Sequence, residues 1–345
     1  MTSTLPVVNA PTVALQSIGA DTSAPIGRHL LGVVNFTDKS SEITIDKACP
    51  RVSVNLAETV GDGFAEVWTT ARPVTTGQFG TISWASDGEF FFGAFHIPEL
   101  PQYAEATEAS YTEVLELTES LGYRPFRIWH YISGLNEPNA AGLETYRDFC
   151  LGRARVLERS GITHDMPAAT VIGAHGGGIV CYLLARRRGA HVNLENPRQV
   201  PAYHYPARYG PKSPNFARAT HLTAADGSTF LYVSGTASIL GHRSMHPGDV
   251  AAQTRLALDN VGYVIGPGNL FAHDLNAGQG LADLTAVKVY VRHRADLPVV
   301  REICRATLPE SADVVYLNAD ICRSDLLVEL EGIAPQQLAT SGSPQ

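Results

Sequence analysis

The sequence contains few cysteines, and their arrangement fits neither a disulfide framework nor a metal site. Five cysteines are scattered over 345 residues, and no two have C-x-x-C spacing. A disulfide framework uses an even number of cysteines, and a structural zinc site uses closely spaced pairs. We therefore expect reduced thiols, as in the cytoplasm, and neither a disulfide framework nor a metal site.

The chain also lacks a long apolar run and an excess of positive charge. No window approaches the roughly eighteen uncharged apolar residues that can cross a bilayer, and residues 1–20 have no basic stretch typical of a secretory signal. The formal net charge is -8, which disfavours a general role in nucleic-acid binding. A cytoplasmic protein that binds neither membrane nor nucleic acid is expected.

Positive charge is nonetheless concentrated in one segment. Residues 186–218 contain seven arginines and lysines and a single acid, Glu195. The segment is also rich in Tyr, Pro and Gly, so it is expected to be a long functional connection. A local excess of cations in an acidic protein favours a pocket for a small anion, and the alternative is a solvated linker between domains.

The order of the expected elements is repeated within the chain. Each copy has a helix, a strand, a second helix and two further strands, which we expect to form a hairpin. The first copy comprises 107–121, 126–132, 143–159, 169–175 and 179–185, and the second comprises 248–264, 284–291, 298–308, 313–318 and 325–334. Because each one-faced sheet needs its own cover, this predicts an α/β (α+β) fold with mixed sheets covered by helices.

The repeat suggests a division of the chain into five parts. Residues 1–27 and 335–345 have little regular pattern and are expected to be a flexible arm and a flexible tail. An N-terminal domain is expected at 28–190 and a C-terminal domain at 229–334. The connection between them, 191–228, is expected to be a loop that contacts the substrate.

The second copy resembles the RidA/YjgF fold. FLYVSG, DVAAQTRLALDNV, VKVYV and DLLVELEGIA follow the order of that fold over residues 229–334, and the first copy matches less strongly. The resemblance implies tandem RidA/YjgF-like (chorismate-mutase-like) units. RidA-like proteins carry a carboxylate-binding arginine at the start of the penultimate strand. The equivalent stretches here, MPAATVIG and ESADVVYLN, contain none, so imine deamination is not expected.

A tandem chain with the connection YHYPARYGPKSPNFARAT resembles the chorismatase family. The segments GPKSPNFARA, LGRARV, VSGTAS and VELEG carry this resemblance, which covers residues 28–334. It implies a cofactor-free enzyme of secondary metabolism that converts chorismate to 3-hydroxybenzoate and pyruvate. Chorismate is then the expected partner, and the fused tandem is expected to be a monomer.

Release of pyruvate requires a proton on the methylene carbon of the vinyl ether of chorismate. The acid must be neutral at working pH, and burial among apolar residues favours that form. Glu329 lies in LLVEL and occupies the position of the family's catalytic glutamate. Glu331 lies on the same strand face and is a competing candidate. The structural alternative for Glu329 is a sheet-edge carboxylate that faces water.

Chorismate also carries two carboxylates, which arginine and lysine side chains hold well through paired hydrogen bonds. Arg218, in SPNFARA, and Arg153, in LGRARV, are the candidate partners. We expect both to point into one pocket with Glu329. Tyr209, Lys212 and Ser213 are further candidate substrate-binding residues, and the alternative for them is an ordinary role in turns.

Two small residues bear on the product and are placed with Glu329 in the catalytic site. Gly235, in VSGTAS, and Cys322, in DICRS, match chorismatases that resemble 3-hydroxybenzoate synthases. The missing methyl group at Gly235 would let the ring tilt, so that its own oxygen captures the cation formed by protonation. The structural alternatives are a bulge for Gly235 and a small buried apolar residue for Cys322.

Two other functions are compatible with these features. One is a hydrolytic chorismatase, which gives a dihydroxycyclohexadiene carboxylate plus pyruvate. The other is a non-catalytic RidA-like protein that binds small anions. The glutamate within an apolar strand and the basic connection favour an enzyme.

Overall fold

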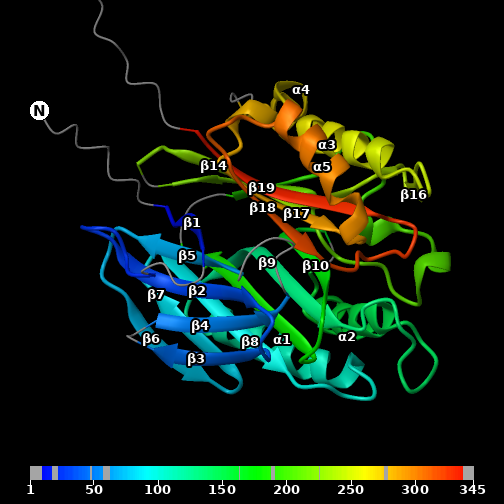
Figure 1. Cartoon of the computed structure of the whole chain (residues 1–345). Coiled ribbons are helices and arrows are strands. Elements are labelled where there is room, and N and C mark those ends of the chain that lie inside the picture. Colours follow the sequence, from blue (N-terminus) through cyan, green and yellow to red (C-terminus); the bar gives the residue numbers. More distant parts are fainter. Residues whose placement is uncertain are drawn as a thin grey trace, which may run out of the picture.

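In the part of the chain that the structure describes, the strands form three β-sheets of five or six strands and a two-stranded ribbon, with helices on the outside (Figure 1). This computed structural model describes residues 10–17, 22–46, 49–56, 63–162, 164–187, 191–224, 226–275 and 279–336. Among these residues we find no helix with the length and apolar character needed to span a bilayer.

One six-stranded sheet and two helices form the first copy of the repeat. They are β6 (Thr75–Phe79), β7 (Ile82–Ser86), β8 (Phe90–Ile97), α1 (Ala104–Ser120), β9 (Arg124–Ser133), α2 (Thr145–Arg159), β10 (Ala168–Ala174) and β11 (Ile179–Arg186). The strand order is β10-β9-β11-β8-β7-β6. Helix α1 ends as the sequence predicts, because Gly122 adopts a φ of 74° that reverses the chain.

A second six-stranded sheet forms the other copy. Its elements are β12 (His191–Leu194), β13 (Ala219–Thr223), β14 (Thr229–Ala237), α3 (Val250–Ile265), α4 (Pro267–Phe271), η3 (Leu281–Asp283), β17 (Ala286–Val291), η4 (Arg294–Asp296), α5 (Leu297–Thr307), β18 (Asp313–Asn318) and β19 (Val328–Gln336). The strand order is β12-β13-β14-β19-β17-β18. Each strand has a counterpart at the same place in the first sheet. The predicted fold of tandem RidA/YjgF-like units with mixed sheets is confirmed.

The prediction that the last two strands of each copy form a hairpin is wrong. Strand β9 lies between β10 and β11, parallel to the first and antiparallel to the second. In the same way, β17 separates β18 from β19. All eight residues of β11 are buried, so this strand needs a partner on each edge, and it pairs with β8 as well as β9. Strand β11 follows β10 closely in the sequence, which suggested a hairpin but gave no sign that β11 lies between β8 and β9.

The third sheet precedes the first copy. It consists of β1 (Thr12–Ser17), β2 (His29–Thr37), β3 (Glu42–Asp46), β4 (Cys49–Asn55) and β5 (Phe64–Thr70), in the order β1-β5-β2-β4-β3. The N-terminal segment expected to be flexible therefore contributes a strand, because β1 pairs with β5 along its whole length. Strand β19 similarly extends two residues into the expected tail. Residues 1–9 and 337–345 lie outside the described residues.

The connection 191–228, expected to be a loop, begins and nearly ends with a strand. Strands β12 and β13 pair with each other, and β13 pairs with β14, so they extend the second sheet. These two segments form strands although many turn-forming residues surround them in the sequence. Between these strands the chain makes two 3-10 turns, η1 (Ala202–His204) and η2 (Ala207–Tyr209). A ribbon of β15 (Ile239–Leu240) and β16 (Arg243–Ser244) follows β14.

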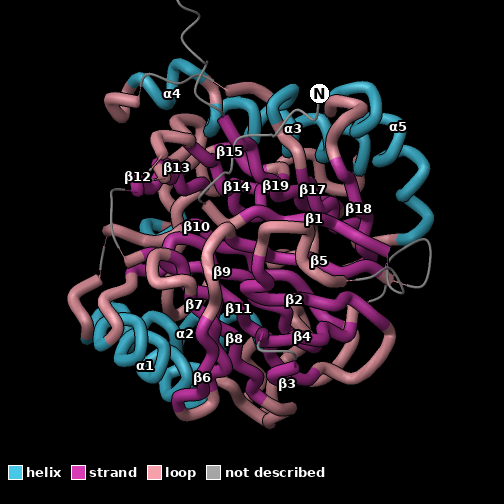
Figure 2. Tube along the Cα trace, turned by 90° about the vertical axis from the view of Figure 1, so that its left-hand side faces the viewer, coloured by secondary structure: helices cyan, strands magenta, loops and turns pink. Residues whose placement is uncertain are grey.

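The main core lies where the three sheets meet. The helices of the two copies lie at opposite ends of the molecule (Figure 1), and the N-terminal sheet lies alongside the sheets of both copies, with β1 near β17 and β3 near β8 (Figure 2). Aromatic residues from all three sheets pack in one buried cluster, including Phe36, Trp129, Tyr182, Tyr232 and Tyr290. Separate apolar clusters fill the spaces beneath the helices of each copy. The helix-free sheet faces therefore bury one another.

Four charged residues lie inside this core. The Nζ of Lys288 is 2.5 Å from the Oε1 of Glu66 and 2.6 Å from the Oε1 of Glu331. The Nη2 of Arg127 is 2.5 Å from the Oε2 of Glu331. Two cations and two carboxylates balance one another, as buried charges require. The cluster joins β5 of the N-terminal sheet to β9, β17 and β19.

Candidate active site

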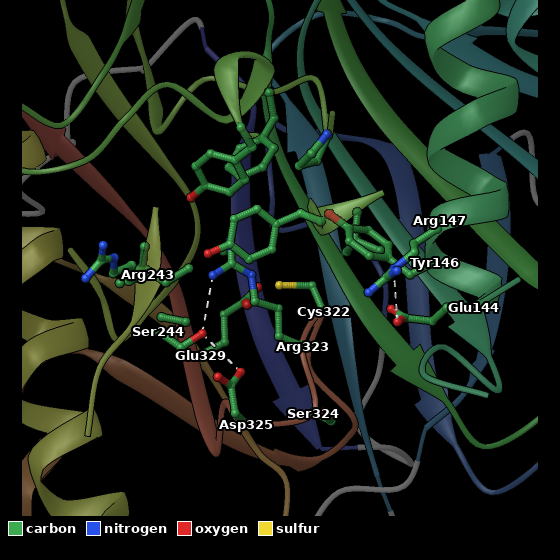
Figure 3. Close-up of a pocket in the computed structure, with 18 of the residues that line it drawn as sticks. Glu144, Tyr146, Arg147, Arg243, Ser244, Cys322, Arg323, Ser324, Asp325 and Glu329 are labelled. Atoms are coloured by element: carbon green, nitrogen blue, oxygen red, sulfur yellow. Dashed lines mark hydrogen bonds and ion pairs between the residues drawn. The ribbon is translucent and has the colours of Figure 1, made fainter. Parts of the chain in front are cut away.

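A cavity of about 550 Å³ opens between the two copies of the repeat. Its walls come from α2 and β10 of the first copy, from β14 and β19 of the second, and from residues 205–218 and 322–325. Figure 3 shows the side chains that line it. Five of them are arginines, namely Arg147, Arg208, Arg218, Arg243 and Arg323. The cavity is thus suited to an anionic ligand.

Glu329 lies on β19 at the wall of this cavity (Figure 3) and is only 4% exposed. Burial, followed by the negative charge of Glu331, raises the pKa of Glu329 to about 8, although Arg218 and Arg127 act in the opposite direction. The carboxyl group is therefore protonated at neutral pH. A neutral carboxyl group beside an anion site can donate a proton to the ligand.

Glu331, two residues further along the strand, does not line the cavity and is ionised. Besides its contacts with Lys288 and Arg127, it accepts hydrogen bonds from the Nε1 of Trp129 at 3.0 Å and the hydroxyl of Tyr290 at 3.1 Å. Burial alone would raise its pKa, but the two cations hold the pKa of Glu331 below its ordinary value. The structure thus separates the two candidates, with Glu329 neutral and Glu331 charged.

Gly235 lies against the Glu329 carboxyl group. It occupies an irregular stretch of β14, where the register with β19 shifts between Val233 and Thr236. A Cβ atom at Gly235 would overlap the Oε1 of Glu329 and lie 3.1 Å from the Cγ2 of Thr170. The glycine therefore makes room for the acid, and the expected bulge is present as well.

Thr170, on β10, links this glycine to the charged core. The backbone N–H of Gly235 donates to the Oγ1 of Thr170 at 2.9 Å. That hydroxyl in turn donates to Glu331 and accepts from the Nη2 of Arg127 at 2.7 Å. The wall of the cavity beside Glu329 is in this way fixed by the network that ionises Glu331.

Cys322 lines the same cavity. Burial, and then the proximity of Glu329, raises the pKa of Cys322 to about 12. The side chain is consequently a neutral thiol at physiological pH and is not activated as a nucleophile. Cys322 therefore fits the role of a small side chain that shapes the wall of the cavity.

Arg218 reaches the cavity from the end of the connection. Its Nη2 donates to the hydroxyl of Tyr205 at 2.7 Å and to the carbonyl of Val200 at 3.2 Å. The nearest carboxylate, that of Glu195, is 3.9 Å from the Nε atom, which is buried without a hydrogen-bond partner. Burial raises the pKa of Glu195 to about 7. The charge of Arg218 is therefore only partly compensated by the protein.

Arg323 is stacked on two tyrosines of the connection. Its guanidinium carbon lies 4.0 Å from the ring centre of Tyr209 and 5.1 Å from that of Tyr205. Its Nη1 donates to the carbonyl of His242 at 2.9 Å and to the Oγ of Ser244 at 3.3 Å, a contact visible in Figure 3. These contacts hold a cation at the cavity wall, and Tyr209, a candidate substrate-binding residue, lines the same cavity.

Three of the expected substrate-binding residues do not line this cavity. Lys212 is at the surface, where its Nζ pairs with Glu158 at 2.6 Å. The Oγ of Ser213 donates to the carbonyl of Tyr205 at 3.0 Å, so it supports the connection. The prediction that Arg153 shares a pocket with Glu329 is wrong: Arg153 faces α1, stacks on Tyr111 and lines a different cavity.

Sequence reasoning missed most of the arginines that do line the cavity. Arg323 directly follows Cys322, and Arg208 directly precedes Tyr209, so each is a sequence neighbour of a predicted site residue. Arg147 and Arg243 carried no such signal. Arg147 lies on α2 and pairs with Glu144 at 3.3 Å. The fold brings these positions together from segments distant in sequence.

A cavity lined by arginines beside a buried, neutral carboxyl group is typical of an enzyme site for a small anion. Comparisons with known proteins agree. The sequence model of the family described as "Chorismatase FkbO/Hyg5-like, N-terminal" matches residues 66–185. A 3-hydroxybenzoate synthase from Streptomyces hygroscopicus is 50% identical over 332 residues, covering 95% of this chain and 98% of that protein. The chain belongs to the chorismatase family.

Two further comparisons extend over almost the whole chain. A chorismatase from Streptomyces rapamycinicus is 46% identical over 333 residues, which is 95% of this chain and 99% of that protein. A crystal structure of a chorismatase superposes with a TM-score of 0.89 at 45% identity, covering 94% of this chain and 98% of the other. The predicted family and fold are thereby confirmed.

Proposed function

We propose that the protein is a chorismatase that converts chorismate to 3-hydroxybenzoate and pyruvate. The observation that carries this proposal is the neutral carboxyl group of Glu329 at the wall of a cavity lined by arginines. Chorismate needs both features, because it has two carboxylates and an acid-sensitive vinyl ether. Relatives at 46% and 50% identity are named chorismatase and 3-hydroxybenzoate synthase.

Arg218 and Arg323 are the residues that we assign to the two carboxylates. Aromatic rings hold both guanidinium groups, with Phe216 at 4.9 Å from Arg218 and Tyr209 at 4.0 Å from Arg323. The nearest carboxylate to Arg218 is that of Glu195 at 3.9 Å, and Arg323 belongs to no ion pair found among the described residues. Fixed cations of this kind orient a dianion before the reaction begins.

The reaction starts with a proton from Glu329. The π electrons of the vinyl ether form a bond from the methylene carbon to that proton, which creates a methyl group and an oxocarbenium ion. Glu329 becomes a carboxylate and stabilises the adjacent cation electrostatically. Burial, together with the charge of ionised Glu331, keeps the proton on Glu329 until a substrate accepts it.

The ring hydroxyl oxygen then bonds to the cationic carbon and gives up its proton, which restores Glu329. The bond between that oxygen and the ring breaks while the neighbouring ring carbon, which carries the ether oxygen, loses its proton, and the ring becomes aromatic. Pyruvate leaves with the former hydroxyl oxygen, the ether oxygen stays on the ring and takes up the proton lost by the ring carbon, and the products together contain all atoms of chorismate. The hydrolytic alternative adds one water molecule and leaves a non-aromatic ring. The missing side chain at Gly235, which leaves room for the Glu329 carboxyl group, and the small neutral thiol of Cys322 support the aromatic outcome, because neither residue restricts tilting of the ring.

The test is to incubate the protein with chorismate in D₂O and to separate the organic acids by chromatography with mass detection. We expect 3-hydroxybenzoate, and pyruvate with one deuterium in its methyl group. Glu329→Gln serves as the control for the acid. A dihydroxycyclohexadiene carboxylate as the main product would replace this function by the hydrolytic one. Unchanged chorismate would support a binding protein instead.

We also propose that the enzyme acts as a cytoplasmic monomer. Its five cysteines are free thiols, as in a reducing compartment, and the cavity is enclosed by the two copies of one chain. Sedimentation equilibrium should therefore give the mass of a single chain, 37.0 kDa. A larger mass that persists on dilution would show an oligomer.

A further inference from the structure

A second cavity, of about 590 Å³, lies on the helix side of the first copy. It is bounded by α1, α2 and the start of β9 and shares no lining residue with the active-site cavity. Aromatic and aliphatic side chains form much of its wall, among them Tyr111, Tyr123, Val114, Ile128 and Leu157. The mechanism proposed above uses none of them.

The residue that sets this cavity apart is Arg153. It is 4% exposed, lines the cavity, and belongs to none of the ion pairs found among the described residues. Its Nε atom is buried without a hydrogen-bond partner, and its guanidinium carbon lies 5.3 Å from the ring centre of Tyr111. A buried cation without an anion is unfavourable, so such a residue is usually paired or is used to bind a ligand.

Two of these features recur at the active site. The Nε of Arg218 is likewise buried without a hydrogen-bond partner, and that guanidinium also rests against an aromatic ring, although the Glu195 carboxylate lies 3.9 Å from the Nε atom. In contrast, Arg155 and Arg159 of the same helix as Arg153 are at the surface and pair with Glu108. Arg153 therefore differs from its neighbours and resembles the substrate-binding arginine.

We propose that the cavity at Arg153 is a second binding site, for a small monocarboxylate with a flat apolar body. The guanidinium group would hold the carboxylate through paired hydrogen bonds. The tyrosine rings and aliphatic side chains would cover the apolar body. Simple aromatic acids have this chemistry, and the volume lies in the range of small-molecule sites.

The probe is benzoate, and the protein is the full-length Arg218→Ala variant, in which the active site binds anions weakly. Isothermal titration should show one remaining benzoate site. Adding Arg153→Met should weaken that binding by about 10- to 100-fold, as loss of a charged hydrogen-bonding partner does. Adding Arg155→Met instead should leave it unchanged, because Arg155 is a surface residue of the same helix.

A second variant keeps the test decisive if Arg153→Met fails to fold. Leu115→Trp fills the cavity from its half-buried rim and leaves Arg153 in place, and it should also abolish benzoate binding in the Arg218→Ala background. The proposal is overturned if Arg218→Ala binds no benzoate, or if neither added change weakens the binding.

Crystals of the wild-type protein soaked with 3-bromobenzoate locate the site directly. Anomalous scattering from bromine should give a peak in the Arg153 cavity, and a peak confined to the active site or the surface contradicts the proposal. The chorismate assay is independent of this result. An inactive protein that still binds benzoate at Arg153 would refute the proposed function and leave the second site standing.

Discussion

Glu329 and Glu331 point to the same side of β19, yet they are in opposite charge states. Glu331 is held ionised by Lys288 and Arg127 at 2.6 and 2.5 Å, whereas Glu329 faces a cavity. Burial is the larger cause of the raised pKa of Glu329, and the negative charge of Glu331 acts in the same direction. The carboxyl group that we propose as the acid is thus kept protonated in part by a carboxylate that lies outside the cavity.

Glu329→Gln preserves the shape of the side chain but removes the acid. We expect kcat at pH 7 to fall by about 10²–10⁴-fold, with a small change in KM. Wild-type kcat should also decline as pH rises through about 8, because Glu329 then ionises. Steady-state rates over a pH series measure both effects.

The exposed Glu302 on α5 provides a matched control, and Glu302→Gln should behave as wild type. Wild-type turnover by Glu329→Gln, or a rate that rises through pH 8, would show that another group supplies the proton.

At the scale of elements, the close approach of β14 to β19 decides how much space surrounds the acid. The register shift before Thr236 brings the backbone of Gly235 against the Glu329 carboxyl group, and a hydrogen bond to Thr170 fixes it there. This proximity gives Gly235 a second effect, because a side chain there would displace the acid as well as restrict the ring.

Gly235→Ala should therefore change the product ratio before it abolishes turnover. We expect less 3-hydroxybenzoate and more of the non-aromatic hydrolysis product, with pyruvate still released and kcat reduced. A change of about 1.4 kcal/mol between competing barriers shifts the ratio tenfold. The organic acids are separated after full conversion, for this variant alone and combined with Cys322→Val.

Gly268→Ala is the control, because a Cβ atom there meets no atom within 4 Å. An unchanged product ratio in the double variant, with pyruvate release intact, would show that these two positions do not set the outcome.

The connection is attached to the 322–325 loop by the stack of Tyr205 and Tyr209 on Arg323. Arg323→Met should therefore raise KM for chorismate by about 10- to 100-fold, because it removes a cation and its charged hydrogen bonds, while kcat changes less. Arg294→Met, at an exposed position on η4, should have no effect. A fall in kcat at constant KM would instead assign Arg323 to the chemical step.

At the scale of the whole molecule, the three sheets meet around a buried cluster of two cations and two carboxylates that neutralise one another. Lys288 contacts Glu66 from the N-terminal sheet and Glu331 from the second copy, and Arg127 brings in the first copy. The stability of the assembly of sheets and the charge state of Glu331 thus depend on the same contacts.

Removing one member of this cluster should destabilise the protein strongly. Glu331→Gln leaves an excess cation in the core and should lower the free energy of unfolding by about 3–5 kcal/mol. The double change with Lys288→Met leaves Glu66 and Arg127 as one charge of each sign, so it should cost less than the sum of the two single changes. Urea unfolding of the four proteins gives this coupling, and strict additivity would contradict it.

The fold class and the glutamate that we propose as the acid could be predicted from the sequence because both leave a local signal. The repeated order of helices and strands identifies the two units, and a glutamate within LLVEL has few reasons to be buried unless it functions. The place of β1 and β11 in their sheets depends on pairing with distant strands. The assignment of Arg153 to the active site was wrong because helix periodicity shows burial without showing which cavity an arginine faces.

The buried acid also links the folding of the chain to the uptake of a proton. Glu329 is ionised in the unfolded chain above about pH 4.5 and neutral in the folded protein below about pH 8. Its contribution to stability is present in full below the lower value and is lost as pH rises to the upper one, by about 1.4 kcal/mol per pH unit. Glu329→Gln should remove this slope and be more stable than wild type at pH 8. Thermal unfolding of both proteins at pH 5 and pH 8 measures it, and an equal pH dependence would mean that Glu329 is charged in the folded enzyme.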